Sequence, residues 1–292
     1  MEIKFFKSLY YKLPFSLINF FHKILSKFHN SVINDFIFSP YGEEYNLTKK
    51  DRINILQSFL KILTEVESGC SLESLITLAK HLLNLKKKST HDEERYIVEC
   101  GCFKGASTSA LSIICDLIGR KIIVYDSFKG LPKTDIEVKT FYTHLNNYGT
   151  YKEGMFRSSL VEFKSNIIKY GKHSSCIIRE GYFEEILKLH SEKLDFVFLD
   201  VDLISSTKSC IKHLWPYLNN DCKIFTDDSC DLEVVKIWFD NNWWTQELNQ
   251  LAPGYIGSGC GLPLGTKFSS LGYSIKNQNY SNFSQASWFV NK

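Results

Sequence analysis

The sequence predicts a doubly wound α/β fold with five parallel strands, a C-terminal antiparallel pair and an N-terminal helical extension. From residue 96 onward, short apolar strand segments alternate with helical segments, which is typical of a parallel sheet covered by helices. The parallel strand segments are 96–100, 121–125, 175–179, 194–199 and 223–226. Segments 273–276 and 287–290, joined by a polar connector, predict an antiparallel hairpin.

Length and composition are those of an ordinary globular protein. The chain has 292 residues, of which 44% are hydrophobic and 23% charged, so it can bury a large core. We expect a helical extension or lid over 1–90 and the α/β domain over 91–292. The net charge of +3 is too small to indicate a nucleic-acid partner.

The nine cysteines follow no metal-binding or disulfide pattern. Their number is odd, no CxxC pair occurs, and several lie inside apolar strand or helix segments. Such cysteines are typically reduced and buried. We therefore expect a reducing, cytoplasmic environment.

The first 45 residues are basic and aromatic, with lysines at 4, 7, 12, 23 and 27 among many phenylalanines. Helical spacing would give this segment an apolar face with a lysine rim. Two interpretations stay open. The segment is either a helical arm that packs on the domain or on a second copy in a homo-oligomer, or an amphipathic segment in peripheral contact with a membrane surface.

The helices and loops are expected as follows. Asp51 is the expected cap of a helix whose apolar positions run from 53 to 63. Further helices are expected over 72–85, 107–118, 156–170, 182–190, 205–217 and 232–241, with a turn at Asn219 and Asn220. Segments 133–153 and 251–265 lack periodicity and are expected to be loops that shape the ligand pocket, the first of them as a lid.

The turn after the first strand, ECGCFKG at 99–105, is a candidate cofactor site. Gly101 permits a sharp turn, and Gly105 permits a close approach of the helix start to a ligand. The carboxylate of Glu99 would repel a phosphate but suits a cationic sulfonium and ammonium. Asp126, at the end of the second strand, suits ribose hydroxyls. The alternative is a turn with a purely structural role.

Acidic residues end two other strands, as Asp200 and Asp202 and as Asp227 and Asp228. In a doubly wound sheet these strand ends open on the same edge as the cofactor turn. Converging carboxylates repel one another unless a cation lies between them, and Mg²⁺ prefers such oxygen ligands. Asp202 and Asp228 are also candidate caps of the helices that follow. We expect some of these acids to bind metal and others to cap.

Five segments together resemble the macrocin and mycinamicin sugar O-methyltransferases of the TylF type, which are class I, Rossmann-like methyltransferases. They are VECGCFKGAST at 98–108, YDSFKGLP at 125–132, EGYFEEIL at 180–187, LDFVFLDVDLISST at 194–207 and FTDDS at 225–229. The resemblance covers about half of the chain, and five segments in register make it specific. Residues from 243 onward do not follow the pattern.

The resemblance implies a role for each matched position. S-adenosylmethionine would contact Glu99, Gly101, Gly105, Ser107, Asp126, Ser127, Phe128, Gly181, Tyr182 and Phe183, and Mg²⁺ would bind Asp200, Asp227 and Asp228. Catechol-type relatives carry a lysine base three residues after the first metal ligand, where this chain has Leu203. The catalytic candidates that remain are Asp200 and Asp202, with His144 in the lid a weaker one.

The predicted function is a methyl transfer that depends on S-adenosylmethionine and Mg²⁺. The acceptor would be a hydroxyl of a sugar or glycosylated small molecule, or, as an alternative, a phenol. A rival interpretation treats Asp200-Val201-Asp202 as the DxD motif of a metal-dependent glycosyltransferase. A third is a non-catalytic scaffold, although a scaffold has no reason to keep repelling carboxylates together.

Overall fold

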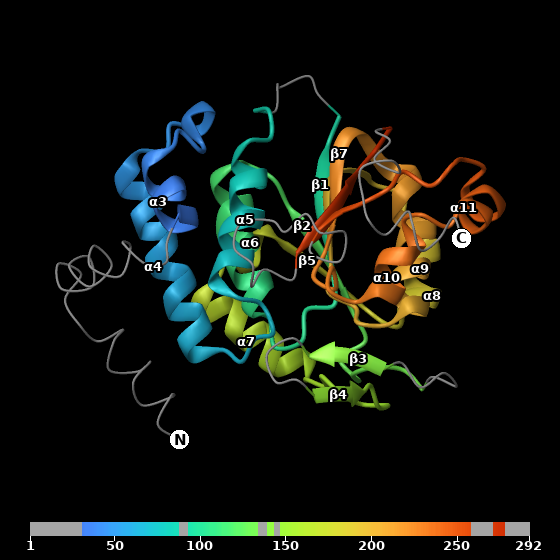
Figure 1. The fold of residues 1–292 in the computed structure, drawn as a ribbon. Helices are drawn as coiled ribbons and strands as arrows, with labels where there is room; N and C mark the ends of the chain where they lie inside the picture. Colours follow the sequence, from blue (N-terminus) through green and yellow to red (C-terminus); the bar gives the residue numbers. More distant parts are fainter. Residues whose placement is uncertain (1–30, 88–92, 134–138, 143–146, 258–270, 278–292) are drawn as a thin grey trace.

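A seven-stranded sheet runs through the centre of the protein (Figure 1). The structure is a computed structural model that describes residues 31–87, 93–133, 139–142, 147–257 and 271–277. The strand order is β5 (Cys176–Glu180), β2 (Ile122–Asp126), β1 (Arg95–Cys100), β6 (Lys193–Leu199), β7 (Leu218–Thr226), β9 (Gly272–Ile275) and β8 (Ile256–Gly257). The first five are parallel and the last two antiparallel, which confirms the predicted doubly wound fold. The order reverses between β1 and β6, so ligands are expected at the carboxyl ends of these strands.

Helices cover both faces of the sheet (Figure 1). One face carries α5 (Leu72–Leu83), α6 (Ala106–Leu117) and α7 (Leu160–Tyr170), and outside these lie α3 (Ser31–Phe38) and α4 (Lys49–Glu65). The other face carries α8 (Phe183–Ile186), α9 (Ile204–Leu214), α10 (Leu232–Ile237) and α11 (Asn241–Leu248). The 3₁₀ turns are η1 (Glu43–Tyr45), η2 (His173–Ser175), η3 (Leu187–Leu189) and η4 (Trp215–Tyr217).

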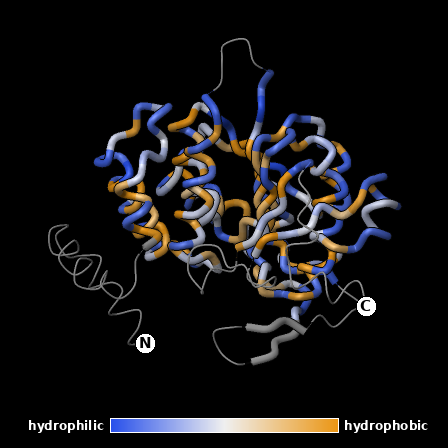
Figure 2. Tube along the Cα trace, turned by 45° about the horizontal axis from the view of Figure 1, so that its top comes forward, coloured by the Kyte–Doolittle hydropathy of each residue, from blue (hydrophilic) through white to orange (hydrophobic). Residues whose placement is uncertain are grey.

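Alternate strand residues enter two separate cores. Ile97 packs with the N-terminal helices, whereas its neighbour Val98 packs with α9 and three buried tryptophans. This alternation follows from the two-residue period of a strand. The hydrophobic positions accordingly gather inside the layers (Figure 2). In the second core, the rings of Trp215 and Trp244 lie 4.9 Å apart, edge to face.

The N-terminal helices are closely tied to one another. Thr48, not Asp51, is the N-cap of α4, and Asp51 closes a capping box by accepting a hydrogen bond from the backbone N–H of Thr48. The buried guanidinium of Arg52 donates to the backbone carbonyls of Ile37, Tyr41 and Leu47, which fixes α4 against the end of α3.

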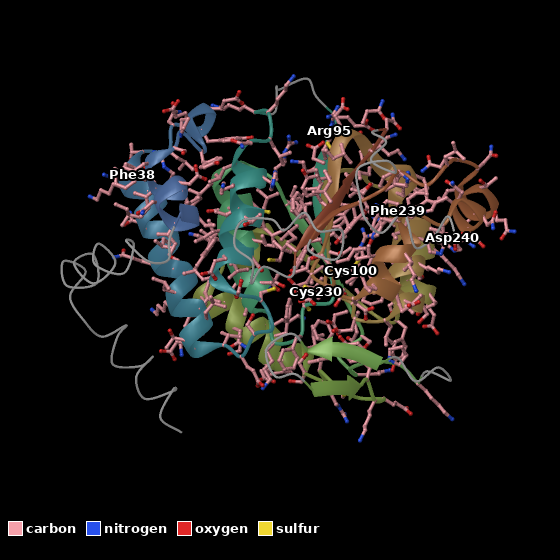
Figure 3. All side chains as sticks on the ribbon, in the orientation of Figure 1. Phe38, Arg95, Cys100, Cys230, Phe239 and Asp240 are labelled. Carbon is pink, nitrogen blue, oxygen red and sulfur yellow. The ribbon has the colours of Figure 1, made fainter. Side chains whose placement is uncertain are left out.

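The exposed surface at the end of α3 includes Phe38, labelled in Figure 3, whose side chain is 66% exposed. Residues 1–30 lie outside the described residues, so the two interpretations of that segment stay predictions. Helices α3–α5 share a hydrophobic core with the sheet. The expected domain boundary at residue 90 stays a prediction.

Several boundaries differ from the sequence-based expectation. The predicted turn at Asn219 and Asn220 lies inside β7, where the register against β6 slips between Leu194 and Phe196. Strand β8 lies in the segment expected to be a loop, 251–265, and pairs with β9. The expected strand 287–290 is outside the described residues. Helix α11 was not expected.

The lid segment contains a short hairpin. Strands β3 (Lys139–Tyr142) and β4 (Asn147–Thr150) pair antiparallel with each other and form a sheet of their own. The candidate base His144 lies between them, outside the described residues.

None of the helices in the described ranges combines the length and apolarity needed to cross a bilayer. The eight cysteines of these ranges form no disulfide; five of them are buried, and Cys176, Cys222 and Cys230 are half-buried.

Candidate active site

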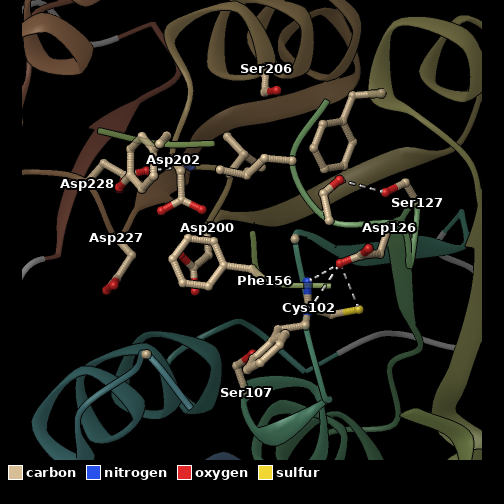
Figure 4. A pocket seen from close by; sticks show the side chains of 18 of the residues that line it. Cys102, Ser107, Asp126, Ser127, Phe156, Asp200, Asp202, Ser206, Asp227 and Asp228 are labelled. Carbon is tan, nitrogen blue, oxygen red and sulfur yellow. Dashed lines mark hydrogen bonds between the residues drawn. The ribbon is translucent and has the colours of Figure 1, made fainter. Parts of the chain in front are cut away.

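A large cavity opens at the carboxyl ends of the central strands (Figure 4). Its volume is about 460 Å³, within the usual range of small-molecule sites. The lining residues come from all five parallel strand ends, from the α4–α5 loop and from the lid region. Figure 4 shows two polar groups in it: Cys102, Asp126 and Ser127 on one side, and the four aspartates Asp200, Asp202, Asp227 and Asp228 on the other.

Asp126 organises the cofactor turn. Its Oδ2 accepts hydrogen bonds from the backbone N–H groups of Cys102 (2.8 Å) and Phe103 (3.2 Å), and its Oδ1 accepts one from Phe128 (2.7 Å). These bonds join the ends of β1 and β2 and hold the carboxylate at the cavity wall. The Cys102 thiol also donates to Oδ2 at 3.4 Å, so Oδ1, which accepts one hydrogen bond, is the oxygen with capacity for a ligand.

The two glycines of the turn are needed for packing. Gly101 has φ +79°, and a Cβ atom there would lie 1.8 Å from the carbonyl oxygen of Asp200 on the adjacent strand. Gly105 has φ +85°, and a Cβ atom there would meet the ring of Phe163 at 2.8 Å. Gly101 lines the cavity, whereas Gly105 lies behind its wall against α7.

Glu99 is buried beneath the turn and does not line the cavity. Burial raises its pKa to about 7, although hydrogen bonds from Ser107 and Thr108 act in the opposite direction. Ser107 itself lines the cavity at the start of α6. Glu99 therefore supports the cofactor turn from the protein interior and not from the cavity surface.

The remaining cofactor candidates divide between the cavity and the core. Ser127, Gly181, Tyr182 and Phe183 line the cavity. Phe128 does not: it is buried, and its ring packs on Phe163 at 5.1 Å. The structure thus brings most, but not all, of the predicted cofactor residues to one surface.

Asp200 and Asp227 face each other at the second polar group. Their backbone N–H groups donate to Cys100 O and Leu199 O, both at 2.9 Å, which continues the strand pairing up to the acids. Burial and the nearby carboxylates of Asp227 and Asp202 raise the pKa of Asp200 well above its ordinary value. A cation here would relieve this repulsion.

Asp202 lies beside this pair, and its backbone has φ +59°, which is uncommon outside glycine. Burial raises its pKa to about 6, and a hydrogen bond from Tyr151 opposes that rise. The backbone N–H of Asp202 donates to Asp228 Oδ2 at 3.2 Å. This hydrogen bond joins the Asp228 carboxylate to the backbone of the loop that carries Asp202.

Neither Asp202 nor Asp228 caps the following helix, contrary to expectation. Helix α9 begins after Leu203 without a side-chain cap. Asp231 caps α10 by accepting from the backbone N–H of Glu233. A cap must directly precede the helix, and α10 begins four residues later than Asp228.

The sequence predicts that the lid segment 133–153 and the N-terminal helices shape the pocket, but it singles out none of the residues by which they close the cavity. Glu67, Ser68, Gly69 and Cys70 come from the α4–α5 loop. Tyr151 and Phe156 follow the lid hairpin, with ring centroids 6.2 Å apart. Only the folded arrangement of the N-terminal helices could have revealed Cys70.

Comparison with known proteins identifies the family of this chain. The family model of macrocin-O-methyltransferase (TylF) matches residues 81–250, more than half of the chain. The chain belongs to the TylF family. The protein is therefore an S-adenosylmethionine-dependent O-methyltransferase.

A solved O-methyltransferase structure has the same fold. The O-methyltransferase NovP is similar with a TM-score of 0.55 and 15% identity, over 74% of this chain and 84% of that one. CalS11, a calicheamicin methyltransferase, is similar with a TM-score of 0.44 and 16% identity, over 78% of this chain and 93% of that one. A search of curated proteins gave no match. The TylF family assignment favours methyl transfer over glycosyl transfer and over a non-catalytic scaffold.

Proposed function

We propose that this TylF-family protein transfers a methyl group from S-adenosylmethionine to a hydroxyl of a sugar or glycosylated small molecule, with the help of Mg²⁺. One observation carries the proposal: a single cavity holds the Asp126 turn on one side and the Asp200–Asp227 pair on the other. A methyl donor and an acceptor bound at these two positions would lie next to each other, as an in-line displacement requires.

The cofactor would occupy the Asp126 side. Asp126 is the candidate acceptor for the ribose hydroxyls, while Gly101 and Ser107 border the space for the methionine part. Tyr182 and Phe183 provide apolar surface suited to adenine. Glu99, Gly105 and Phe128 would support this wall from behind. Once bound, S-adenosylmethionine supplies the methyl group as an electrophile.

Asp200 and Asp227 fit a divalent cation, since their carboxylates lie close together in a site that raises the pKa of Asp200. Asp228 is adjacent and would complete the acid set, although one of its oxygens accepts the Asp202 N–H. A bound cation would neutralise these acids and lower the pKa of a nearby hydroxyl as a Lewis acid.

Asp202 is the group best suited to take the acceptor proton. It lines the cavity next to the Asp200–Asp227 pair. Burial raises its pKa to about 6 in the cation-free protein, and a bound cation would lower that value and keep the carboxylate ionised, ready to accept a proton. The hydrogen bond from Tyr151 would hold the carboxylate in place. The position of the lysine base in catechol-type enzymes is occupied here by the buried, uncharged Leu203.

The lining supports a neutral, hydroxylated acceptor. Tyr151, Phe156, Leu131 and Pro132 provide apolar surface on which a sugar ring can pack. Within the described residues, the cavity lining includes several carboxylates and no lysine, arginine or histidine. Away from the proposed cation, such a surface repels a phosphate, so a neutral acceptor is favoured.

The test uses the purified full chain and methyl-labelled S-adenosylmethionine with matched panels of glycosides, phenols and sugar phosphates. We expect label in neutral glycosides, with loss of transfer on chelation of divalent cations and recovery on addition of Mg²⁺. Transfer confined to phenols would refute the sugar acceptor, and transfer that resists chelation would refute the metal role.

A further inference from the structure

A cysteine from the N-terminal helices completes a three-residue group with the two facing aspartates. The side chain of Cys70 is 6% exposed, and its Sγ lies 3.8 Å from Asp200 Oδ2. One ligand atom from each of Cys70, Asp200 and Asp227 can be chosen so that all three lie within 4.8 Å of one another. Among the described residues, this is the only such group of histidine, cysteine and acidic side chains.

The α4–α5 loop holds Cys70 in this position by contacts that do not involve the sulfur. Its backbone N–H donates to Ser68 Oγ at 3.1 Å, and α5 begins directly after it with Ser71 as N-cap. Lys104 of the cofactor turn pairs with Glu67 of the loop at 2.9 Å. The loop is thereby fastened to the methyltransferase sheet, and the thiol is placed beside the acids before any cation binds.

The spacing matches that of two ligands on one metal ion. Metal–sulfur and metal–oxygen bonds of about 2.3 and 2.1 Å at a tetrahedral angle place the ligand atoms about 3.6 Å apart. The observed Sγ–Oδ2 distance of 3.8 Å needs little adjustment. Carboxylates suit Mg²⁺ and Mn²⁺, whereas a thiolate favours Zn²⁺, Co²⁺ or Fe²⁺.

We propose that Cys70 is a further protein ligand of the cation, a sulfur ligand beside the acids, and that the site binds transition-metal ions such as Zn²⁺ and Co²⁺ as well as Mg²⁺. The inference rests on the cation site of the proposed function and adds a sulfur ligand to it. It also gives the N-terminal helices a direct part in the active site. The alternative is a thiol that only donates a weak hydrogen bond to Asp200.

Cobalt spectroscopy tests this without an activity assay. The purified full chain is titrated anaerobically with Co²⁺, and both the visible ligand-field bands and the near-ultraviolet sulfur-to-cobalt charge-transfer band are followed. We expect the charge-transfer band in the wild type and its loss in Cys70→Ser and Cys70→Ala. Because Cys230 also lines the cavity, Cys230→Ser is the matched control and should keep the band.

Two further arms complete the experiment. Asp200→Asn with Asp227→Asn should also remove the band, which links it to this group and not to another thiol. The affinity for Zn²⁺ should fall by about tenfold or more in Cys70→Ser, since even indirect partners of a metal contribute that much, while Mg²⁺ affinity should change little. Retained binding of S-adenosylmethionine by the variants verifies their folding.

The outcomes distinguish a failure of the Cys70 assignment from a failure of the proposed metal role. Co²⁺ binding without a charge-transfer band, or with a band lost in Cys230→Ser instead, would overturn the assignment of Cys70 and leave the acid site intact. Failure of the wild type to bind any divalent cation would overturn both this assignment and the metal role proposed above.

Discussion

Thr108 Oγ1 donates a hydrogen bond of 2.5 Å to Glu99 Oε2, which joins the first turn of α6 to the end of β1 beneath the cofactor turn. The other oxygen, Glu99 Oε1, is buried without a hydrogen-bond partner in the described structure. An ionised carboxylate is costly in such a position, so burial raises the pKa of Glu99 to about 7.

This pKa predicts a specific pH dependence of stability. Because the folded pKa of about 7 exceeds the ordinary value of 4.5, the folded protein binds more protons than the unfolded chain between these values. Stability contributed by this group is therefore lost as pH rises from about 4.5 to 7. Glu99→Gln should flatten that part of the curve and stabilise the ligand-free protein at pH 8 by roughly 1–3 kcal/mol. Urea unfolding of both proteins at pH 5 and pH 8 measures it, and equal differences at the two pH values would contradict the prediction.

Gly101→Ala should be severely destabilising, because the new Cβ atom would collide with the carbonyl oxygen of Asp200 and φ is positive. We expect a loss of at least about 3 kcal/mol, or failure to fold. Gly119→Ala is the matched control: its φ is +66°, but no atom lies within 4 Å of the added Cβ, so about 1 kcal/mol is expected. Thermal unfolding compares the two, and similar losses would show that backbone strain alone decides.

Asp126→Asn should weaken the binding of S-adenosylmethionine by about tenfold or more, since a charged acceptor of hydrogen bonds contributes roughly 1.5–3 kcal/mol. The amide has a single acceptor oxygen for the backbone N–H groups of Cys102 and Phe128 on its two sides. Ser127→Ala is the control, because Ser127 Oγ bonds only within its own turn, to Gly130 O and Lys129 N–H. Calorimetric titration with the cofactor should show a smaller loss for Ser127→Ala, which removes only a neutral hydroxyl, than for Asp126→Asn. Equal losses, or an unaffected Asp126→Asn, would remove the ribose role.

Asp202→Asn should lower kcat by about 10²–10⁴ and leave cofactor affinity nearly unchanged, because the amide cannot accept the proton of the acceptor hydroxyl. Asp202→Glu should recover part of the rate, since the carboxylate is restored at a shifted position. Steady-state kinetics with the best acceptor provides the comparison. A wild-type rate in Asp202→Asn would assign the base elsewhere.

Strand positions and strand-end chemistry could be read from the sequence because they are local. The apolar runs that end in Asp126, Asp200 and Asp227 mark buried parallel strands, and parallel strands bring their carboxyl ends to one edge. The helix caps were predicted wrongly. Thr48, not Asp51, caps α4, and Asp231, not Asp228, caps α10.

What the sequence could not reveal depends on contacts between distant segments. Cys70 is 130 residues from Asp200 along the chain, and no local pattern predicts that their side chains meet. Glu99 and Gly105 carry the right motif, yet packing places them behind the cavity wall. Strand β8 escaped prediction because two residues in a glycine-rich stretch carry no periodicity.

The central claim is that one cavity binds the methyl donor at the Asp126 turn and uses the acids on its other side for transfer. Asp227→Ala removes one of these acids and leaves the Asp126 turn unchanged, so it separates cofactor binding from methyl transfer. The decisive measurement is calorimetric titration of this variant with S-adenosylmethionine, run beside the labelled-methyl assay. The account predicts near wild-type cofactor binding and no methyl transfer in this variant. An absence of cofactor binding by the wild-type protein, or full transfer by Asp227→Ala, would contradict it.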